Sequence, residues 1–426
     1  MDTVIEHGGV EVVLQLNDWR KSRRLQIQVF GCYLLFTLFG LGEQTLGTLI
    51  PKLQEYYHLN DLTMSMTYVL VMMGYFTMAA VNEATHNRVG VRGMVTLGIS
   101  FLVALYLVVL LRPPHWLFLL SYMFIGCGFG GLDAGVNGWM GELVDANQLL
   151  GILHGCYGLG CMILPPLVTY LIHHTSWQWN DYYLVLALIA SLALIVTLIS
   201  FKYETPAKFD YMRKQKGVNE DPPTIIDIFK LKMAMLVALA LFLYVGAEVA
   251  FGQWLVSFLL RAKGLLYPIA SWMATSFWAG LTVGRMTLGF VTAHYFTSAT
   301  KANMFYIFTQ TVLMAMFLGI QFLATHPNGF VISLDFVMVF ITGIFVGPVF
   351  PTVIMSIYEV LPASMHTGAM GFICAFGGGG GAVIPFVVGL VSKLSNKGIS
   401  TMPTIITLTM ATLTLLWFYI LRKSKL

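Results

Sequence analysis

The sequence predicts an all-α integral membrane protein with twelve transmembrane helices. Hydrophobic residues make up 57% of the 426 residues and charged residues only 10%, whereas soluble chains carry roughly 25% charged residues. Apolar runs recur along the chain, each near the ~20 residues that a helix needs to cross ~30 Å of hydrocarbon. They lack the alternating pattern of a membrane β-barrel. The composition therefore argues against a soluble enzyme, a secreted domain and a nucleic-acid-binding protein.

A polar linker at residues 202–232 divides the expected spans into two sets of six. On either side of it we expect a first six-helix bundle at 27–201 and a second at 233–421, with a cytoplasmic N-terminal segment at 1–26 and a cytoplasmic tail at 422–426. The twelve spans are expected at residues 27–50, 63–82, 91–111, 116–141, 149–173, 181–201, 233–260, 268–292, 302–324, 330–357, 366–392 and 402–421.

The basic residues predict the orientation, because cytoplasmic loops retain Lys and Arg. With twelve spans, 17 of the 24 Lys and Arg residues fall on the side of the two termini, six fall on the other side, and Arg285 lies inside a span. Both termini are therefore expected in the cytoplasm. No Asn-x-Ser/Thr site is present, so plasma membrane and internal membrane both stay open.

Neither a cofactor nor a metal ion is expected. The five cysteines all fall in apolar spans and have no metal-ligand spacing. The glycine run 377–381 lacks the Lys-Ser/Thr that completes a phosphate-binding loop. Close helix packing is the better explanation for this run.

The two halves contain a weak parallel repeat, which is typical of transporters whose halves are related by an axis along the membrane normal. Three pairs of spans contribute matches in the same order. Glu43 and Gly47 align with Glu248 and Gly252; Gly126, Gly130 and Glu142 with Gly343, Gly347 and Glu359; and Gly151, Gly158, Gly160 and Pro165 with Gly371, Gly378, Gly380 and Pro385.

Between the second and third expected spans, the segment Glu83-Ala-Thr-His-Asn87-Arg88-Val-Gly90-Val-Arg92 resembles the signature of the major facilitator superfamily. Arg88, Gly90 and Arg92 match it, whereas Glu83 and Asn87 replace its usual Gly and Asp. The resemblance implies the major facilitator fold, with two six-helix bundles, and transport of a small molecule by a chain that functions as a monomer.

Further motifs resemble the branch of this superfamily that contains fucose permease and the sodium-dependent glucose transporter relatives, and its fungal members most of all. One departure is Gly47, where bacterial fucose permease has an acidic residue. The motifs are Gly131-Leu-Asp133-Ala-Gly-Val-Asn137, Phe242-Leu-Tyr244-Val-Gly246-Ala-Glu248, Gly280-Leu-Thr-Val-Gly284-Arg285 and His154-Gly-Cys-Tyr157-Gly158-Leu-Gly160.

Asp133, Glu248 and Glu43 are the candidate proton-binding residues, because a carboxylate at a helix centre costs roughly 2.5–3.5 kcal/mol. The competing interpretation is a carboxyl group held by neighbours for packing. Asn137 follows Asp133 by four residues on the same helix face, where the two groups suit a hydroxylated ligand. The other candidates are Gln44, Gln253, Tyr157, Tyr244, Trp254 and Trp278 for the solute and His154 for a proton relay.

Two sets of charges are expected near the cytoplasmic ends of the bundles. We expect Arg88 and Arg92 to act with Glu142, and Arg285 with Glu359, as gating pairs that form in one state and break in another. Simple anchoring at the membrane surface is the alternative.

The sequence thus predicts a secondary active transporter of a small sugar-like solute, driven by H⁺ through alternating access. Facilitated diffusion and a non-transporting nutrient sensor with the same fold remain as alternatives. A membrane enzyme is disfavoured, because no catalytic His/Asp grouping or large loop is present. The expected partners are the solute, H⁺ and the lipid bilayer.

Overall fold

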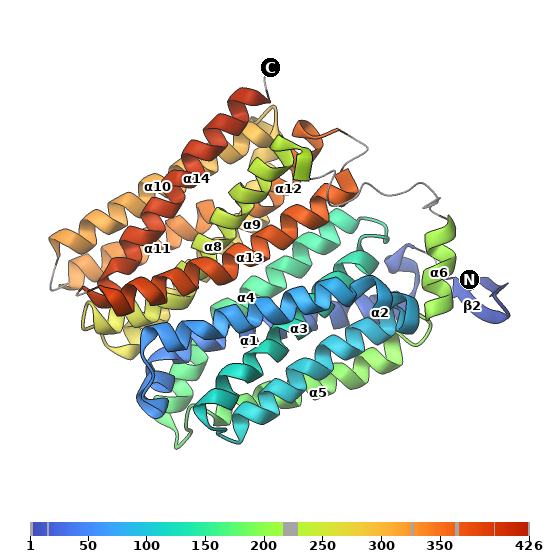
Figure 1. Ribbon diagram of the computed structural model, residues 1–426, viewed down its shortest axis with the longest axis horizontal. Helices are drawn as coiled ribbons and strands as arrows, with labels where there is room; N and C mark the ends of the chain where they lie inside the picture. Colours follow the sequence, from blue (N-terminus) through green and yellow to red (C-terminus); the bar gives the residue numbers. More distant parts are fainter. Residues whose placement is uncertain are drawn as a thin grey trace. The chain divides into compact units, whose positions relative to one another are not determined.

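The computed structural model describes residues 3–14, 17–215, 229–324, 328–362, 366–395 and 397–424. These residues are helical apart from one N-terminal hairpin and short connections (Figure 1). Residues 216–228 of the expected linker, and the side chain of Glu83, lie outside the described part.

The chain folds as two compact units whose boundaries do not follow the linker. The first unit contains residues 1–42, 70–160 and 177–221, and the second contains 43–69, 161–176 and 222–426. The second unit therefore includes two segments of the first half, residues 43–69 and 161–176, which pack with helices of the second half.

The helices of the first half are long. Their bounds are α1 (Arg23–Tyr57), α2 (Asp61–Leu110), α3 (His115–Met140), α4 (Ala146–His174), α5 (Asp181–Ser200) and the short α6 (Pro206–Gln215), preceded by the 3₁₀ turn η1 (Trp19–Lys21).

In the second half, α8 packs extensively against α13, α9 against α11, and α10 against α14. The bounds are α8 (Lys232–Arg261), α9 (Tyr267–Tyr295), α10 (Ala299–Leu323), α11 (Gly329–Val346), α12 (Val349–Val360), α13 (His366–Leu394), η3 (Gly398–Thr401) and α14 (Met402–Lys423).

Eleven helical segments in the described residues are long and apolar enough to cross a membrane. The remaining expected span, 268–292, corresponds to the 29-residue α9, which carries Arg285 in its interior. The expected span 330–357 is divided into α11 and α12. It breaks at Gly347-Pro348, because proline has no N–H to continue the helical hydrogen bonds.

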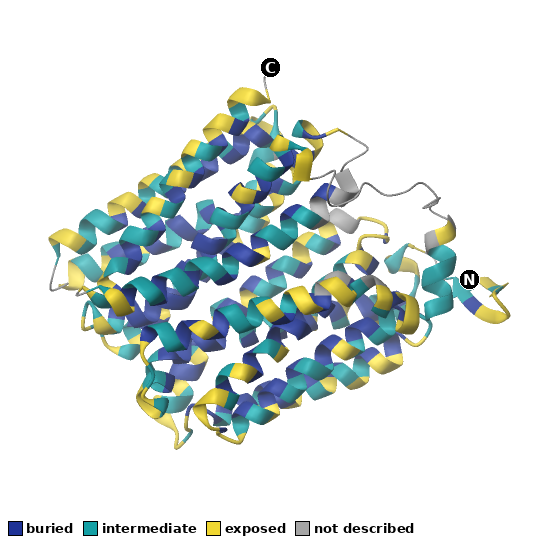
Figure 2. Cartoon of the chain, in the orientation of Figure 1, coloured by how far each residue is buried: buried dark blue, intermediate teal, exposed yellow. Residues whose placement is uncertain are grey.

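The exposed faces of the long helices carry many large apolar side chains. Leu188, Phe290 and Leu415 are 63%, 79% and 72% exposed, and Figure 2 shows exposed residues along the outer sides of α10 and α14. Large exposed apolar side chains on membrane-length helices suit contact with lipid tails.

The glycines of the repeat make equivalent helix contacts in the two halves. In the first unit, a Cβ on Gly160 of α4 would overlap the carbonyl oxygen of Thr37 in α1, and in the second unit a Cβ on Gly380 of α13 would overlap that of Phe242 in α8. Gly126 and Gly343 likewise press against backbone carbonyls of α2 and α9. Only glycine allows helices to approach this closely, so the repeat found in the sequence is also present in the helix contacts.

The two spans in α2 separate at Gly90, where φ is 67° and ψ is −176°. The start of α6 lies directly against this glycine, and the Arg92 N–H donates to the Glu204 carbonyl at 3.2 Å. His86 packs over the Phe209 ring of α6, with centroids 5.1 Å apart. The first part of the linker is thus docked on the segment that resembles the superfamily signature.

The N-terminal segment contains a hairpin that the sequence analysis did not predict. Strands β1 (Thr3–His7) and β2 (Val10–Leu14) pair antiparallel through Gly8-Gly9, both at positive φ. His7 Nε2 lies 2.9 Å from Asp210 Oδ2 in α6, and Lys214 Nζ lies 2.8 Å from the same oxygen. Lys214 and His7 hold the pKa of the Asp210 carboxyl below its usual range.

Candidate functional site

Asp133 lies at the centre of a hydrogen-bonded cluster in the first unit. Its Oδ1 accepts from the Asn137 amide at 2.7 Å, as the four-residue spacing on α3 predicts, and its Oδ2 accepts from the Tyr75 hydroxyl of α2 at 3.1 Å. The Asn137 Oδ1 is buried and has no hydrogen-bond partner among the described residues. This oxygen can accept a hydrogen bond from a ligand.

The aromatic candidates of α4 lie against α1. Tyr157 packs edge-on to Phe39 with centroids 5.5 Å apart, and Phe39 in turn stacks on Phe129 of α3. His154 packs edge-on to Phe36 at 5.6 Å. Tyr157 and His154 are half-buried in these contacts.

Glu248 forms an ion pair inside the second unit. Arg285 of α9 donates to Glu248 of α8 at 2.9 Å, and their side chains are 13% and 6% exposed. Tyr244, one turn before Glu248, donates its hydroxyl to the Val346 carbonyl at 2.8 Å. The carboxylate at 248 thus has a permanent cation beside it, unlike Asp133, whose hydrogen-bond donors are neutral.

Gln44 and Gln253 make a reciprocal contact between α1 and α8 in the second unit. The Gln44 amide donates to the Gly252 carbonyl at 3.2 Å, and the Gln253 amide donates to the Glu43 carbonyl at 3.1 Å. Gly47 lies against the backbone of Gln253. These residues join the first helix of each half.

The two tryptophan candidates are fully packed. The Trp254 indole N–H donates at 3.0 Å to the carbonyl of Pro385, a proline inside α13. Trp278 is 1% exposed and lies against Gly252. Both side chains therefore serve the packing of the second unit in this state.

In this structure Arg285 and Glu359 have other partners than each other, and their expected gating pair stays a prediction. Arg285 contacts Glu248, whereas Glu359 accepts hydrogen bonds from the backbone N–H groups of Ala299 and Thr300 at 2.6 and 3.0 Å. These are unsatisfied donors at the start of α10, which a carboxylate caps favourably. The sequence repeat aligned Glu359 with Glu142, but it could not show this cap.

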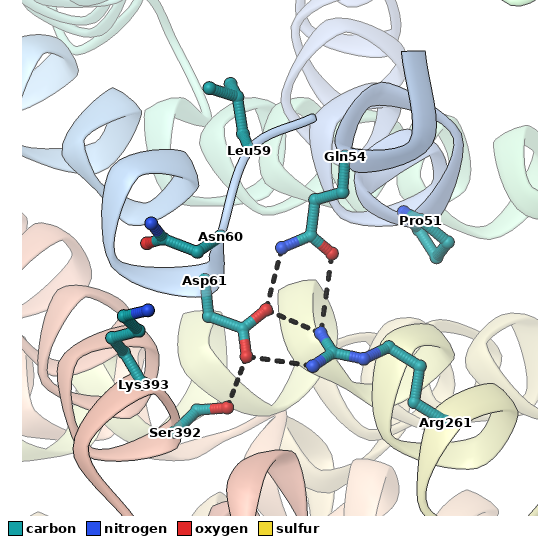
Figure 3. Close-up of a pocket in the computed structure, with 8 residues that line it drawn as sticks. All are labelled: Pro51, Gln54, Leu59, Asn60, Asp61, Arg261, Ser392 and Lys393. Carbon is teal, nitrogen blue, oxygen red and sulfur yellow. Dashed lines mark hydrogen bonds and ion pairs between the residues drawn. The ribbon is translucent and has the colours of Figure 1, made fainter. Parts of the chain in front are cut away.

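A charged network in the second unit was missed by the sequence analysis. Asp61, the first residue of α2, binds Arg261 at the end of α8 through both carboxylate oxygens, at 2.5 and 3.0 Å. Gln54 and Ser392 donate to the same carboxylate at 2.7 and 2.5 Å. The network borders a pocket of about 500 Å³ (Figure 3). No sequence signal links residues 200 positions apart.

Comparison with known proteins decides the family. Residues 32–385 match the model of the Major Facilitator Superfamily. The chain belongs to this superfamily. It is a multi-pass membrane transporter rather than an enzyme, and it has the superfamily's twelve-helix fold.

Similar proteins agree with this assignment to the superfamily. The chain is 33% identical to Bypass of stop codon protein 6 of Saccharomyces cerevisiae, over 97% of this chain and 86% of that protein. It is 25% identical to a Glucose/galactose transporter of Brucella abortus, over 84% and 86%. The E. coli fucose:proton symporter has the same fold, with a TM-score of 0.62 at 17% identity, covering 92% of this chain and 98% of that one.

In this superfamily member, the three remaining gating candidates lie around the signature segment and the end of α3. Arg88 is exposed, and Arg92 is half-buried beside Glu204. Glu142 is exposed in the turn after α3. Their gating role stays a prediction.

Proposed function

We propose that the chain is a secondary active transporter of a small hydroxylated, sugar-like solute, coupled to H⁺ and working by alternating access. Asp133 is the proton-binding residue, and Asn137 and Tyr75 bind the solute beside it. The other solute contacts are Gln44, Gln253 and Tyr157, with His154 at the cytoplasmic side.

The Asp133 cluster is the observation that carries this proposal. A sugar hydroxyl is both a donor and an acceptor, so it can donate to the unpartnered Asn137 Oδ1. Aromatic rings near polar groups, as at Phe39 and Tyr157, suit the apolar C–H face of a sugar. The B. abortus relative, a Glucose/galactose transporter, supports the same solute class.

Proton coupling is assigned to Asp133 rather than to Glu248 because of their neighbours. The Glu248 carboxylate is engaged by Arg285, and separating a buried ion pair is costly. Among the residues that the structure describes, Asp133 accepts from the neutral donors Tyr75 and Asn137. A proton there removes the cost of a buried charge, so Asp133 suits reversible protonation.

The chain functions as a monomer with both termini in the cytoplasm, an orientation that the distribution of Lys and Arg supports. The proposed moving bodies of the transport cycle are the two six-helix bundles at 27–201 and 233–421, although residues 43–69 and 161–176 pack with the second half in this structure.

Solute exchange tests the transport function without assuming any coupling ion. The purified chain is reconstituted in liposomes loaded with unlabelled D-glucose, D-galactose, L-fucose or sorbitol, and entry of the same labelled compound is measured. We expect exchange with at least one sugar and a higher half-saturating concentration of that sugar in Asn137→Leu. Binding of a sugar to the purified chain without exchange would identify a sensor and contradict the proposal.

A further inference from the structure

The ends of α1 and α8 form a seam within the second unit, and both helices run in the same direction along it. Gln44 of α1 contacts Gly252 of α8 at a first level along the seam. At a second level, the Gln54 Oε1 of α1 accepts from Arg261 of α8 at 3.4 Å. At 1.5 Å per residue the two levels are about 14 Å apart. The start of α2 covers the seam, because Tyr68 packs near Trp254 with centroids 6.4 Å apart.

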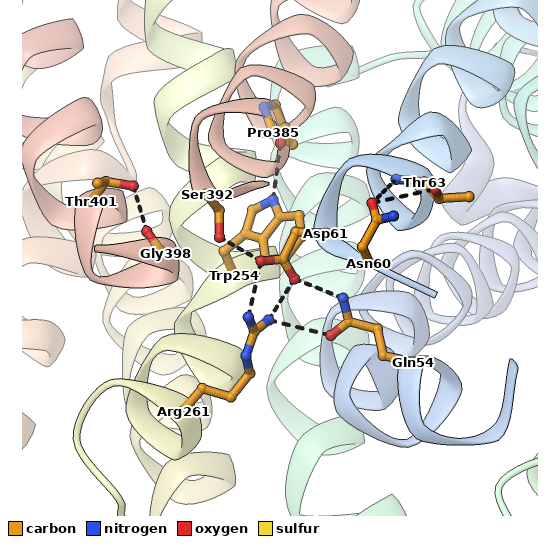
Figure 4. A network of polar contacts seen from close by, with 10 residues as sticks. All are labelled: Gln54, Asn60, Asp61, Thr63, Trp254, Arg261, Pro385, Ser392, Gly398 and Thr401. Atoms are coloured by element: carbon orange, nitrogen blue, oxygen red, sulfur yellow. Dashed lines mark hydrogen bonds and ion pairs between the residues drawn. The ribbon is translucent and has the colours of Figure 1, made fainter. Parts of the chain in front are cut away.

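One end of the seam is closed by the charged network of Asp61, Arg261, Gln54 and Ser392 (Figure 4). It joins α1 and α2 of the first half to α8 and α13 of the second. Asn60 fixes the position of Asp61, because its side chain accepts from the Thr63 N–H at 3.0 Å and caps α2.

Behind this network, the seam buries polar atoms that have no partner. Five side-chain atoms lack a hydrogen bond in the part of the chain that the structure describes, and their residues are at most 6% exposed. Thr48 and Ser257 follow Gln44 and Gln253 by four residues, on the same helix faces. The five atoms are Gln44 Oε1, Thr48 Oγ1, Tyr68 OH, Gln253 Oε1 and Ser257 Oγ.

A permanently closed helix contact has no use for so many unpaired polar groups, because each one loses its hydrogen bonds to water on burial. Groups of this kind suit an interface that opens and becomes wet in another state. The ion pair also suits a reversible contact. Arg261 is 40% exposed beside the pocket, so water can replace Asp61 when the two halves separate.

We propose that Asp61 and Arg261 hold one end of the solute pathway shut, and that Gln44, Thr48, Tyr68, Gln253 and Ser257 contact the hydroxylated solute when this end opens. The solute part rests on the proposed transport function. The Lys and Arg distribution places this end on the side opposite the termini.

Labelling of a cysteine in the seam tests the closure directly. Ser257→Cys is introduced, and its reaction with a membrane-impermeant maleimide is measured in liposomes, with the chain lacking that substitution as the blank for the five native cysteines. We expect Asp61→Asn to increase the labelling rate at least about fivefold, the low end of typical coupling between states. The double reversal Asp61→Arg with Arg261→Asp should return the rate toward its original value.

Asp335→Asn is the matched control. Asp335 is also a buried carboxylate of the second unit, 2% exposed, but it accepts from Gln321 and lies outside the seam. The proposed closure would be overturned if Asp335→Asn increased the labelling rate as much as Asp61→Asn, or if Asp61→Asn did not increase it. If Asp61→Asn does not fold, Ser392→Ala removes one donor to the same carboxylate, and an unchanged labelling rate in that variant also overturns it.

The solute contact is tested with Tyr68→Phe and Ser257→Ala. We expect each to raise the labelled D-glucose or D-galactose concentration that gives half-maximal exchange, with Ser333→Ala on the exposed face of α11 as the control. Unchanged half-saturation in both variants contradicts the contact. If no sugar exchanges in any variant while Asp61→Asn still accelerates labelling, the proposed solute class fails and the closure stands.

Discussion

Arg285 donates to Glu248 over 2.9 Å, and this buried pair links α9 to α8 inside the second unit. Removing one partner leaves an uncompensated buried charge, which costs about 3–5 kcal/mol. We therefore expect Glu248→Gln to lower the thermal unfolding midpoint of the chain in detergent more than any of the other single substitutions proposed for the second unit.

The double variant Glu248→Gln with Arg285→Gln serves as the control for this pair. It removes both charges, so we expect it to be more stable than either single variant. If the unfolding midpoint of the double variant falls by the sum of the two single decreases, the two charges do not depend on each other.

The close contact of α4 with α1 at Gly160 predicts a large packing effect. Gly160→Ala places a methyl group against the Thr37 carbonyl, and we expect a loss of about 1–3 kcal/mol, measured as a lower unfolding midpoint. Gly319→Ala in α10 is the control, because nothing lies within 4 Å of its added Cβ. Alanine favours helices over glycine, so this variant should be neutral or more stable.

The unpartnered Oδ1 of Asn137 predicts a specific solute contact. We expect Asn137→Leu to raise the half-saturating sugar concentration about tenfold, which corresponds to about 1.4 kcal/mol. Deoxy analogues of the sugar identify the hydroxyl, because the analogue that lacks it should bind the wild type and Asn137→Leu equally weakly. Equal losses with every analogue would argue for a purely structural role.

The hairpin should depend on Asp210, which binds both His7 and Lys214. Because the pKa of Asp210 lies below its usual value near 3.9, this contact is present at neutral pH and is lost as the pH falls through the lowered pKa. We expect Asp210→Asn to speed hydrogen exchange in β1 and β2 at pH 7. Asp18→Asn, which alters contacts with the neighbouring Arg20 and Lys21 in η1 and does not touch α6, should leave that exchange unchanged.

The sequence predicted the helices well because membrane spans depend on the length and hydrophobicity of local segments. It also predicted that Asp133 and Asn137 share one helix face, since a spacing of four residues fixes their relative positions on a helix, and the structure adds that they hydrogen-bond directly. The hairpin was missed, although Gly8-Gly9 between two β-branched runs is a hairpin signal. A polar N-terminal segment outside the spans gave no reason to look for strands.

Contacts between distant helices were the part that the sequence could not supply. Arg285 aligned with a family motif, but its partner Glu248 lies on another helix, 37 residues away. Asp61 and Arg261 each looked like an ordinary charge at the end of a span. Their pairing depends on how four helices pack, which no local pattern records.

Solute-driven proton movement tests the central claim most directly. Liposomes containing the chain and an internal pH dye receive the exchanging sugar without any imposed gradient, and wild type is compared with Asp133→Asn. The account predicts acidification on sugar addition in the wild type, and in Asp133→Asn no acidification while sugar exchange is retained. Acidification of equal size in Asp133→Asn would contradict the assignment of coupling to this carboxylate.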